Sequence, residues 1–177
     1  IIGGQTGSFD IGTDTFGAYD LAADINVQTS ENSALRINVH SDSLDNHRDS
    51  FEGDRVGFNP TFKLELSDQT VLDLSYEHAD HERFIDRGGP TQNGRPVEAL
   101  AGTTFGSKDT NVQTLTADIF KGTLRHQFSE TSKGQISLQV DEFEKMYQNL
   151  YVSGYDGSLV TMDGYRDPTE RENTFLD

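Results

Sequence analysis

The chain has 177 residues, a formal net charge of −16 and an apolar fraction of 33%, which is low for a globular protein with one large core. The acidic balance argues against nucleic-acid binding, for which a basic surface is expected. No run of residues approaches the ~18 apolar positions of a membrane helix, and the absence of cysteine excludes disulfides and thiolate chemistry.

Six stretches in which apolar and polar side chains alternate follow one another along the chain. A period of two is that of a strand whose faces have different surroundings. In the first stretch, Leu21 and Ile25 alternate with Asp20, Asp24 and Asn26. The alternation predicts strands at about residues 16–29, 34–41, 55–66, 70–84, 114–128 and 135–151. Residues 3–10 are expected to end a further strand, and another begins at about residue 166.

Pro60 is an exception within the third predicted strand, residues 55–66. Proline has no amide hydrogen to donate to a neighbouring strand. We therefore expect a bulge or a missing ladder hydrogen bond close to it.

The connections between the predicted strands alternate between short and long. Short polar turns lie at residues 30–33, 67–69 and 130–134, whereas long loops are predicted at 42–54, 86–113 and 152–165. Short turns at one end and long loops at the other are typical of outer-membrane barrels. The sequence therefore predicts an all-β fold, an antiparallel meander of about six to eight strands that is part of a transmembrane β-barrel. No internal repeat is evident.

The two ends of the sequence favour a fragment of a larger barrel. The N-terminal residues lack the basic and apolar regions of a signal peptide, and residues 171–177 read as the middle of a strand. Open barrel edges expose unpaired backbone groups, which are costly in lipid, so we expect that this piece alone does not span a membrane stably. The alternative is a small complete eight-stranded outer-membrane barrel with an adhesin or structural role. A soluble calcium-binding β-sandwich is a weaker third possibility.

One segment carries a more specific pattern. Ser75-Tyr76-Glu77 leads through Arg83 into Asp86-Arg87-Gly88-Gly89-Pro90, followed by Gly94-Arg95-Pro96 and Phe105-Gly106. This order resembles the early barrel of TonB-dependent siderophore receptors, in which an aromatic residue and an acid end a strand before a D-R-G-x-P loop, a G-x-P element and an F-G pair. Gly89 departs from the pattern, in which a larger apolar residue is expected. Further similar elements are Asp49-Ser50-Phe51, Asn59-Pro60, Asp68-Gln69-Thr70 and His126-Gln127-Phe128.

The resemblance implies a receptor in the outer membrane of a bacterial cell. Such receptors bind ferric siderophores outside the cell and move them inward when the TonB energy-transducing complex pulls an N-terminal plug domain. The expected partners are the remainder of a barrel of about 22 strands, the plug, the TonB complex, a ferric siderophore and outer-membrane lipid, with no nucleic acid. The plug and the TonB box have no counterpart in this sequence.

Basic and aromatic residues gather at the predicted outer ends of two strands, where a barrel mouth could hold a flat anionic iron chelate by charge and stacking. The candidate ligand-binding residues are Arg83, Phe84, Arg87, Arg95, Tyr147, Tyr151 and Tyr155. An interfacial aromatic girdle and loop packing are the alternative roles for these side chains.

Metal and catalytic sites are not predicted. His78 and His81 lie among acidic residues, but residues three apart on a strand point to opposite faces and do not easily share an ion. Asp42, Asp45 and Asp49 lack the spacing of a known calcium loop. The chain has no G-x-S-x-G or H-E-x-x-H motif, so we expect no enzyme activity. We also expect no intrinsic cofactor, the ferric siderophore being a transported ligand.

Overall fold

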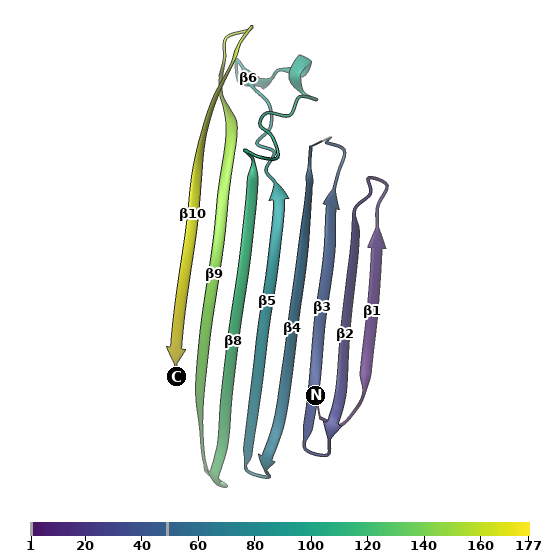
Figure 1. Cartoon of the computed structure of the whole chain (residues 1–177), viewed down its shortest axis with the longest axis vertical. Helices are drawn as coiled ribbons and strands as arrows, with labels where there is room; N and C mark the ends of the chain where they lie inside the picture. Colours follow the sequence, from purple (N-terminus) through teal and green to yellow (C-terminus); the bar gives the residue numbers. More distant parts are fainter. Residues whose placement is uncertain (1, 49) are drawn as a thin grey trace.

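The computed structural model describes residues 2–48 and 50–177. Its eight long strands lie side by side in one antiparallel sheet, in the order β1-β2-β3-β4-β5-β8-β9-β10 (Figure 1). The strands are β1 (Thr6–Thr13), β2 (Tyr19–Ser30), β3 (Ser33–Asp45), β4 (Glu52–Ser67), β5 (Thr70–Phe84), β8 (Val112–Ser129), β9 (Ser132–Tyr155) and β10 (Val160–Leu176). Each long strand pairs with the next one along the chain, which confirms the predicted all-β antiparallel meander.

The short and long connections lie at opposite ends of the sheet (Figure 1). Turns of two residues, 31–32, 68–69 and 130–131, join strands at one end. The connections 14–18, 46–51, 85–111 and 156–159 lie at the other, which we call the outer end. We call residues 85–111 the outer loop.

The outer loop contains the only short elements of the structure in the described ranges. Strands β6 (Thr91–Gln92) and β7 (Arg95–Pro96) form a hairpin, and the 3-10 helix η1 (Glu98–Leu100) follows it. Asn93 and Gly94, with φ of 52° and 74°, make the hairpin turn, the backbone conformation for which an Asn-Gly pair is favoured. Among the described residues 2–48 and 50–177, no helix has the length and apolar character needed to cross a membrane.

Several strands extend further at the outer end than the alternation predicts, whereas β2 is shorter there and begins at Tyr19 rather than at residue 16. β5 has the predicted bounds, but β3 continues to Asp45 and β9 to Tyr155. β10 begins at Val160 rather than near residue 166. The loops predicted at 42–54 and 152–165 are therefore shorter, at 46–51 and 156–159. These outer segments carry polar residues on both faces, so the alternation disappears while the backbone ladder continues.

The register collects the apolar side chains of neighbouring strands on one side of the sheet, the apolar face. Ile25 lies opposite Ile37, and Leu124 lies opposite both Leu72 and Ile136. The apolar face includes Phe9, Ile11, Leu21, Ile25, Val27, Leu35, Val39, Phe58, Phe62, Leu64, Leu72, Leu74, Phe120, Leu124, Ile136, Leu138 and Val140. Many of these side chains are open to the surroundings; Ile11 is 70% exposed and Leu138 43%.

The opposite side, the polar face, carries ion pairs between strands. Arg36 Nε lies 2.8 Å from Asp24 Oδ1, and Arg55 Nη2 lies 2.8 Å from Asp42 Oδ2. A third pair joins Arg125 to an acidic residue of β5. The two faces of the sheet therefore differ sharply in polarity.

The sheet is a single layer with almost no core. Among the described residues, the only buried apolar side chains are Ala34, Phe84, Ile85 and Ala117. A β-sandwich requires two packed sheets, so the third possibility raised from the sequence, a calcium-binding sandwich, is wrong for the described part of the chain.

Pro60 leaves a gap in the ladder between β4 and β5. Phe58 pairs with His78 and Thr61 with Ser75, but no pair forms at positions 59 and 60. The side-chain amide of Asn59 donates instead to the carbonyl oxygen of Tyr76 at 3.0 Å. The predicted missing ladder bond is confirmed, and no bulge forms there because the register is the same on both sides.

The three short turns share one local structure. Each begins with a serine, Ser30, Ser67 or Ser129, whose hydroxyl accepts a hydrogen bond from the amide two residues later at 3.3 Å. In each, the strand register shifts just before the serine. The sequence Ser-acid-polar-Ser/Thr therefore recurs at residues 30–33, 67–70 and 129–132, a short internal repeat that the sequence analysis missed.

Candidate functional site

The base of the outer loop is held by one buried side chain, Asn111, which is 0% exposed. Its amide nitrogen donates to the carbonyl oxygens of Leu150, Ile85 and Phe105 at 2.8, 3.0 and 3.3 Å. Its amide oxygen accepts from the Leu150 amide at 3.0 Å. Gly106 has φ of +102°, and a Cβ there would lie 2.1 Å from the Asn111 oxygen. The Phe105-Gly106 pair is therefore a structural requirement of this packing.

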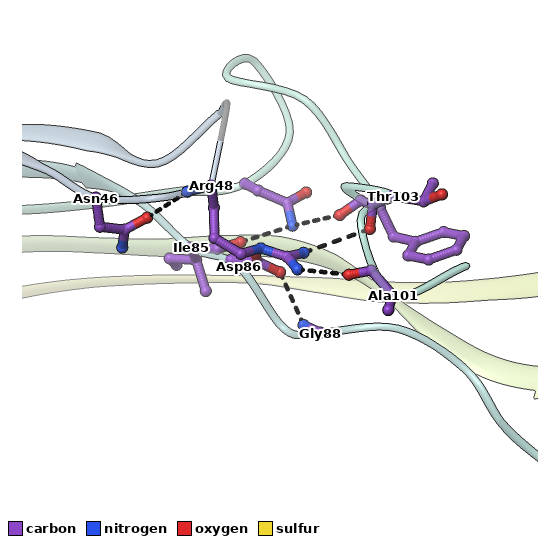
Figure 2. Close-up of polar contacts among 9 residues, drawn as sticks. Asn46, Arg48, Ile85, Asp86, Gly88, Ala101 and Thr103 are labelled. Atoms are coloured by element: carbon purple, nitrogen blue, oxygen red, sulfur yellow. Dashed lines mark hydrogen bonds and ion pairs between the residues drawn. The ribbon is translucent and has the colours of Figure 1, made fainter. Parts of the chain in front are cut away.

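A second set of contacts joins the outer loop to the β3–β4 connection (Figure 2). Arg48 Nε donates to Asp86 Oδ2 at 2.5 Å. Its two terminal nitrogens donate to the carbonyl oxygens of Ala101 at 2.9 Å and Thr103 at 3.4 Å. The other oxygen of Asp86 accepts from the Gly88 amide at 2.8 Å. One guanidinium thus contacts the outer loop at three points.

Arg87, which follows Asp86, reaches a group of tyrosines on β9 and β10. Its Nη1 lies 3.4 Å from the Tyr147 hydroxyl and 3.5 Å from the Tyr165 hydroxyl. Its guanidinium carbon lies 5.4 Å from the ring centre of Tyr151, within the range of a cation–π contact. The hydrogen bonds to Tyr147 and then Tyr165 raise the pKa of Arg87 further above its ordinary value, so it stays charged.

The tyrosines also contact one another, and we call Tyr147, Tyr151 and Tyr165 the tyrosine cluster. The rings of Tyr147 and Tyr165 stack with centres 5.8 Å apart and planes 21° from parallel. Tyr151 meets Tyr165 edge-on at 6.5 Å, and its hydroxyl lies 3.5 Å from Asp163 Oδ2. The strand register places the cluster on the polar face, in line with Lys145 and Asp167.

The remaining candidate residues lie apart from this cluster. Arg83 donates to the side-chain oxygen of Gln113 at 3.0 and 2.8 Å, on the polar face. Arg95 is exposed in the β6–β7 hairpin, and Tyr155 ends β9. Phe84 is only 4% exposed, so little of its ring is open to a ligand in this structure, and its role in binding stays a prediction.

Three residues of this region were missed from the sequence. Tyr165 joins the cluster because β10 begins earlier than predicted and pairs it with Asn149. Asn149 is 1% exposed, and its side-chain amide has no hydrogen-bond partner among the described residues. Arg48 contacts a residue 38 positions away. Tyr165 could have been found from the hairpin register, whereas Arg48 carried no local signal.

The histidines and acids considered for metal binding do not form a site within the described ranges. His78 pairs with Asp118 at 2.9 Å on the apolar-face side, while His81 lies opposite Arg55 on the polar face. No group of three or more potential ligands gathers among residues 2–48 and 50–177. Asp49, considered with Asp42 and Asp45 for calcium, lies outside the described residues.

Chemically, the Arg87 region combines a fixed positive charge with several aromatic faces and hydroxyl donors. A guanidinium forms paired hydrogen bonds with anionic oxygens and stacks on flat ring systems. Tyrosine rings offer stacking surface and a polar edge. The arrangement therefore suits a flat, anionic, aromatic ligand better than a small cation or an aliphatic one.

The solved structures similar to this chain include two of the ferric-catecholate import receptor Fiu from E. coli K12. The open form matches 97% of this chain with a TM-score of 0.74 and 16% sequence identity. The closed form matches 97% with a TM-score of 0.70 and 17% identity. This chain spans 29% and 27% of the respective receptor chains. The likeness shows the fold alone, an all-β antiparallel meander like part of the barrel of that protein. No protein-family profile matches the chain, and no curated protein matches it.

Proposed function

We propose that this chain forms barrel wall and outer mouth of a TonB-dependent outer-membrane receptor for ferric siderophores. One observation carries the proposal: a single-layered sheet exposes an apolar face on one side and an ion-paired face on the other. In water the apolar face would be an unusually large hydrophobic surface, whereas in a barrel it faces lipid and the polar face lines the lumen. The fold likeness to the import receptor Fiu and the motif pattern of residues 75–106 both support this assignment.

The orientation follows from the two ends of the sheet. In outer-membrane barrels the short turns face the periplasm and the long loops face the exterior. The outer loop and the tyrosine cluster would then lie at the cell surface, on the lumen side. A ferric catecholate is anionic and presents flat aromatic rings, which matches the chemistry around Arg87. The plug and the TonB complex would act through segments of the receptor outside this chain, and iron would be cargo.

Binding to the full-length receptor tests the proposal. Ferric dihydroxybenzoate is titrated against wild type and Arg87→Gln, and loss of one desolvated charge contact is expected to weaken binding about tenfold, or ~1.4 kcal/mol. Arg36→Gln, which breaks an ion pair on the inner part of the polar face, is the control and should leave affinity unchanged. Equal affinity in wild type and Arg87→Gln would remove this surface from the binding site. Undiminished iron uptake in cells lacking the receptor would contradict the receptor function.

A complete eight-stranded barrel is the second candidate, favoured by the eight strands of the main sheet. Closure would require β1 to pair with β10, but the two strands lie at opposite edges of the sheet (Figure 1). A heat-modifiable, monomeric barrel formed in detergent by this chain alone would favour the complete barrel and an adhesin or structural role. The receptor assignment predicts that this chain alone does not form such a barrel in detergent.

A further inference from the structure

We infer that Arg48 is a positioning residue for Arg87: it fixes the backbone of the outer loop so that the Arg87 guanidinium meets the tyrosine cluster. The inference rests on the proposed function, because it concerns the surface assigned there to the chelate. Arg48 itself contacts no residue of the cluster.

The ion pair of Arg48 with Asp86 is partly buried, whereas the hydrogen bonds of Arg48 to Ala101 and Thr103 are exposed. The Arg48 side chain is 22% exposed and that of Asp86 14%, so their ion pair is less screened than the surface pairs of the sheet. The Arg48 backbone amide is itself fixed by a hydrogen bond to Asn46 Oδ1 at 2.8 Å. The hydrogen bond to Asn46 therefore helps to hold the backbone from which the guanidinium projects toward Asp86 (Figure 2).

Asp86 transmits the contact because both of its carboxylate oxygens are used. Oδ2 accepts from Arg48 Nε and Oδ1 accepts from the Gly88 amide. Gly88 has φ of +79°, a left-handed conformation that sharply turns the chain after Arg87. Arg87 lies between these two fixed points, so its side chain leaves the backbone toward Tyr147 and Tyr165.

Arginine is required at position 48 by the spread of its acceptors. One carboxylate and two carbonyl oxygens, from Asp86, Ala101 and Thr103, surround one planar group. A guanidinium presents five donors in a rigid fork, whereas a lysine ammonium is a compact point donor. Lysine would keep the charge but would not bridge residue 86 to residues 101 and 103.

The test combines loop order with a thermodynamic cycle in the full-length receptor. Hydrogen exchange of residues 85–103 and affinity for ferric dihydroxybenzoate are measured for wild type, Arg48→Met, Arg48→Lys, Arg87→Gln and the double variant Arg48→Met/Arg87→Gln. Arg36→Met, which removes an ion pair with Asp24 elsewhere on the polar face, is the matched control.

We expect Arg48→Met and Arg48→Lys to speed exchange in residues 85–103 and to weaken binding about fivefold, with the control unchanged. In the Arg87→Gln background, Arg48→Met should cause no further loss, because residues that act through one another are not additive. Additive losses, unchanged exchange, or full rescue by lysine would each overturn the positioning role. If the wild-type receptor binds no ferric chelate, the proposed function fails, and the exchange comparison alone then decides whether Arg48 fixes the outer loop.

Discussion

Asn111 shows how one residue can hold together segments that are distant in sequence. Its amide contacts Ile85 just after β5, Leu150 within β9 and Phe105 in the outer loop. Its oxygen accepts two hydrogen bonds and its two N–H hydrogens are shared among three carbonyl oxygens, so the full donor and acceptor capacity of an asparagine side chain is used. Because the residue is fully buried, water cannot easily replace these bonds.

Replacement of Asn111 by alanine should therefore loosen the outer loop. A buried backbone group left without a partner costs ~1–3 kcal/mol. Since Asn111 contacts several such groups, we expect the outer loop to lose about 2–4 kcal/mol of local stability. The measurement is the rate of proteolysis within residues 85–111 of the full-length receptor. Gln92→Ala, in the exposed hairpin strand β6, is the control, and equal cleavage rates for Asn111→Ala and wild type would contradict the assigned role.

Among single residues, the sequence indicates those whose chemistry gives a local signal. Arg87, Tyr147 and Tyr151 are basic or aromatic residues near strand ends and lie close together in the structure, while their role in ligand binding stays a prediction. Tyr165 was missed because its place depends on the register of β9 against β10, which shifts at a bulge near Thr161. Arg48 was missed because its partner is on another loop, and no periodicity reports such a contact.

The strands and turns of the sheet obey simple local rules. Alternation marked the middle of each strand, where one face is apolar, and failed at the outer ends, where both faces are polar. The three serine turns are a second rule: the hydroxyl accepts the amide hydrogen that the tight turn would otherwise leave free. Their recurrence at the three two-residue turns of the main sheet indicates a common way of reversing its long strands.

Ser67→Ala should weaken the β4–β5 turn. The substitution removes two exposed hydrogen bonds, the one accepted from the Gln69 amide and the one donated to Thr70 Oγ1. Their loss is expected to cost about 0.5–1 kcal/mol, measured as a lower urea midpoint for the full-length receptor. Glu31→Ala, at a turn position whose side chain makes no hydrogen bond in the structure, should leave the midpoint unchanged. A larger effect at Glu31 than at Ser67 would show that turn charge, and not the hydroxyl, sets the stability.

The β9–β10 connection should respond to acid. Asp156 Oδ1 accepts from the amides of Leu159 at 2.7 Å and Ser158 at 2.8 Å, and these bonds lower the pKa of Asp156. A folded-state pKa below the unfolded value gives stability that is complete above the unfolded value and is lost as pH falls through the folded one. The turn should therefore loosen below about pH 4.

Pepsin cleavage within residues 156–159 measures this effect in the acid range. Asp156→Asn keeps an acceptor oxygen but does not titrate, so the ratio of wild-type to variant cleavage should rise as pH falls. A constant ratio would show that protonation of Asp156 does not govern the turn.

Across the whole molecule, the two faces differ in how their charges are balanced. The polar face carries charges of both signs: its bases are Arg36, Arg55, Lys63, Arg83, Lys121, Arg125, Lys145 and Arg171, and its acids include Asp10, Asp20, Asp24, Asp42, Asp73, Asp141, Asp163 and Asp167. The apolar face carries acids beyond its apolar band, with Glu142 opposite Glu172 and Glu144 opposite Glu170. Acids without a basic neighbour of this kind contribute to the net charge of −16.

Two neighbouring residues test which face meets lipid. Leu138→Arg places a charge in the apolar band and should cost ~2–4 kcal/mol in a membrane-embedded barrel, whereas Gln139→Arg points to the polar face near Asp141 and should be nearly neutral. Folding yield of the full-length receptor in lipid vesicles is the measurement. Equal yields for the two variants would contradict the lipid assignment, since Leu138 is already 43% exposed and an arginine there would be harmless in water.

The turn of the β6–β7 hairpin is a suitable position for inserting a peptide label. The hairpin closes on its own Asn93-Gly94 turn and through the Val97 amide, which donates to Pro90 at 3.1 Å, and neither Arg48 nor Asn111 contacts its tip. A foreign peptide inserted between Asn93 and Gly94 would leave both sets of anchoring contacts uncut. In the proposed orientation an antibody against that epitope would stain intact bacteria, giving a reporter of surface display.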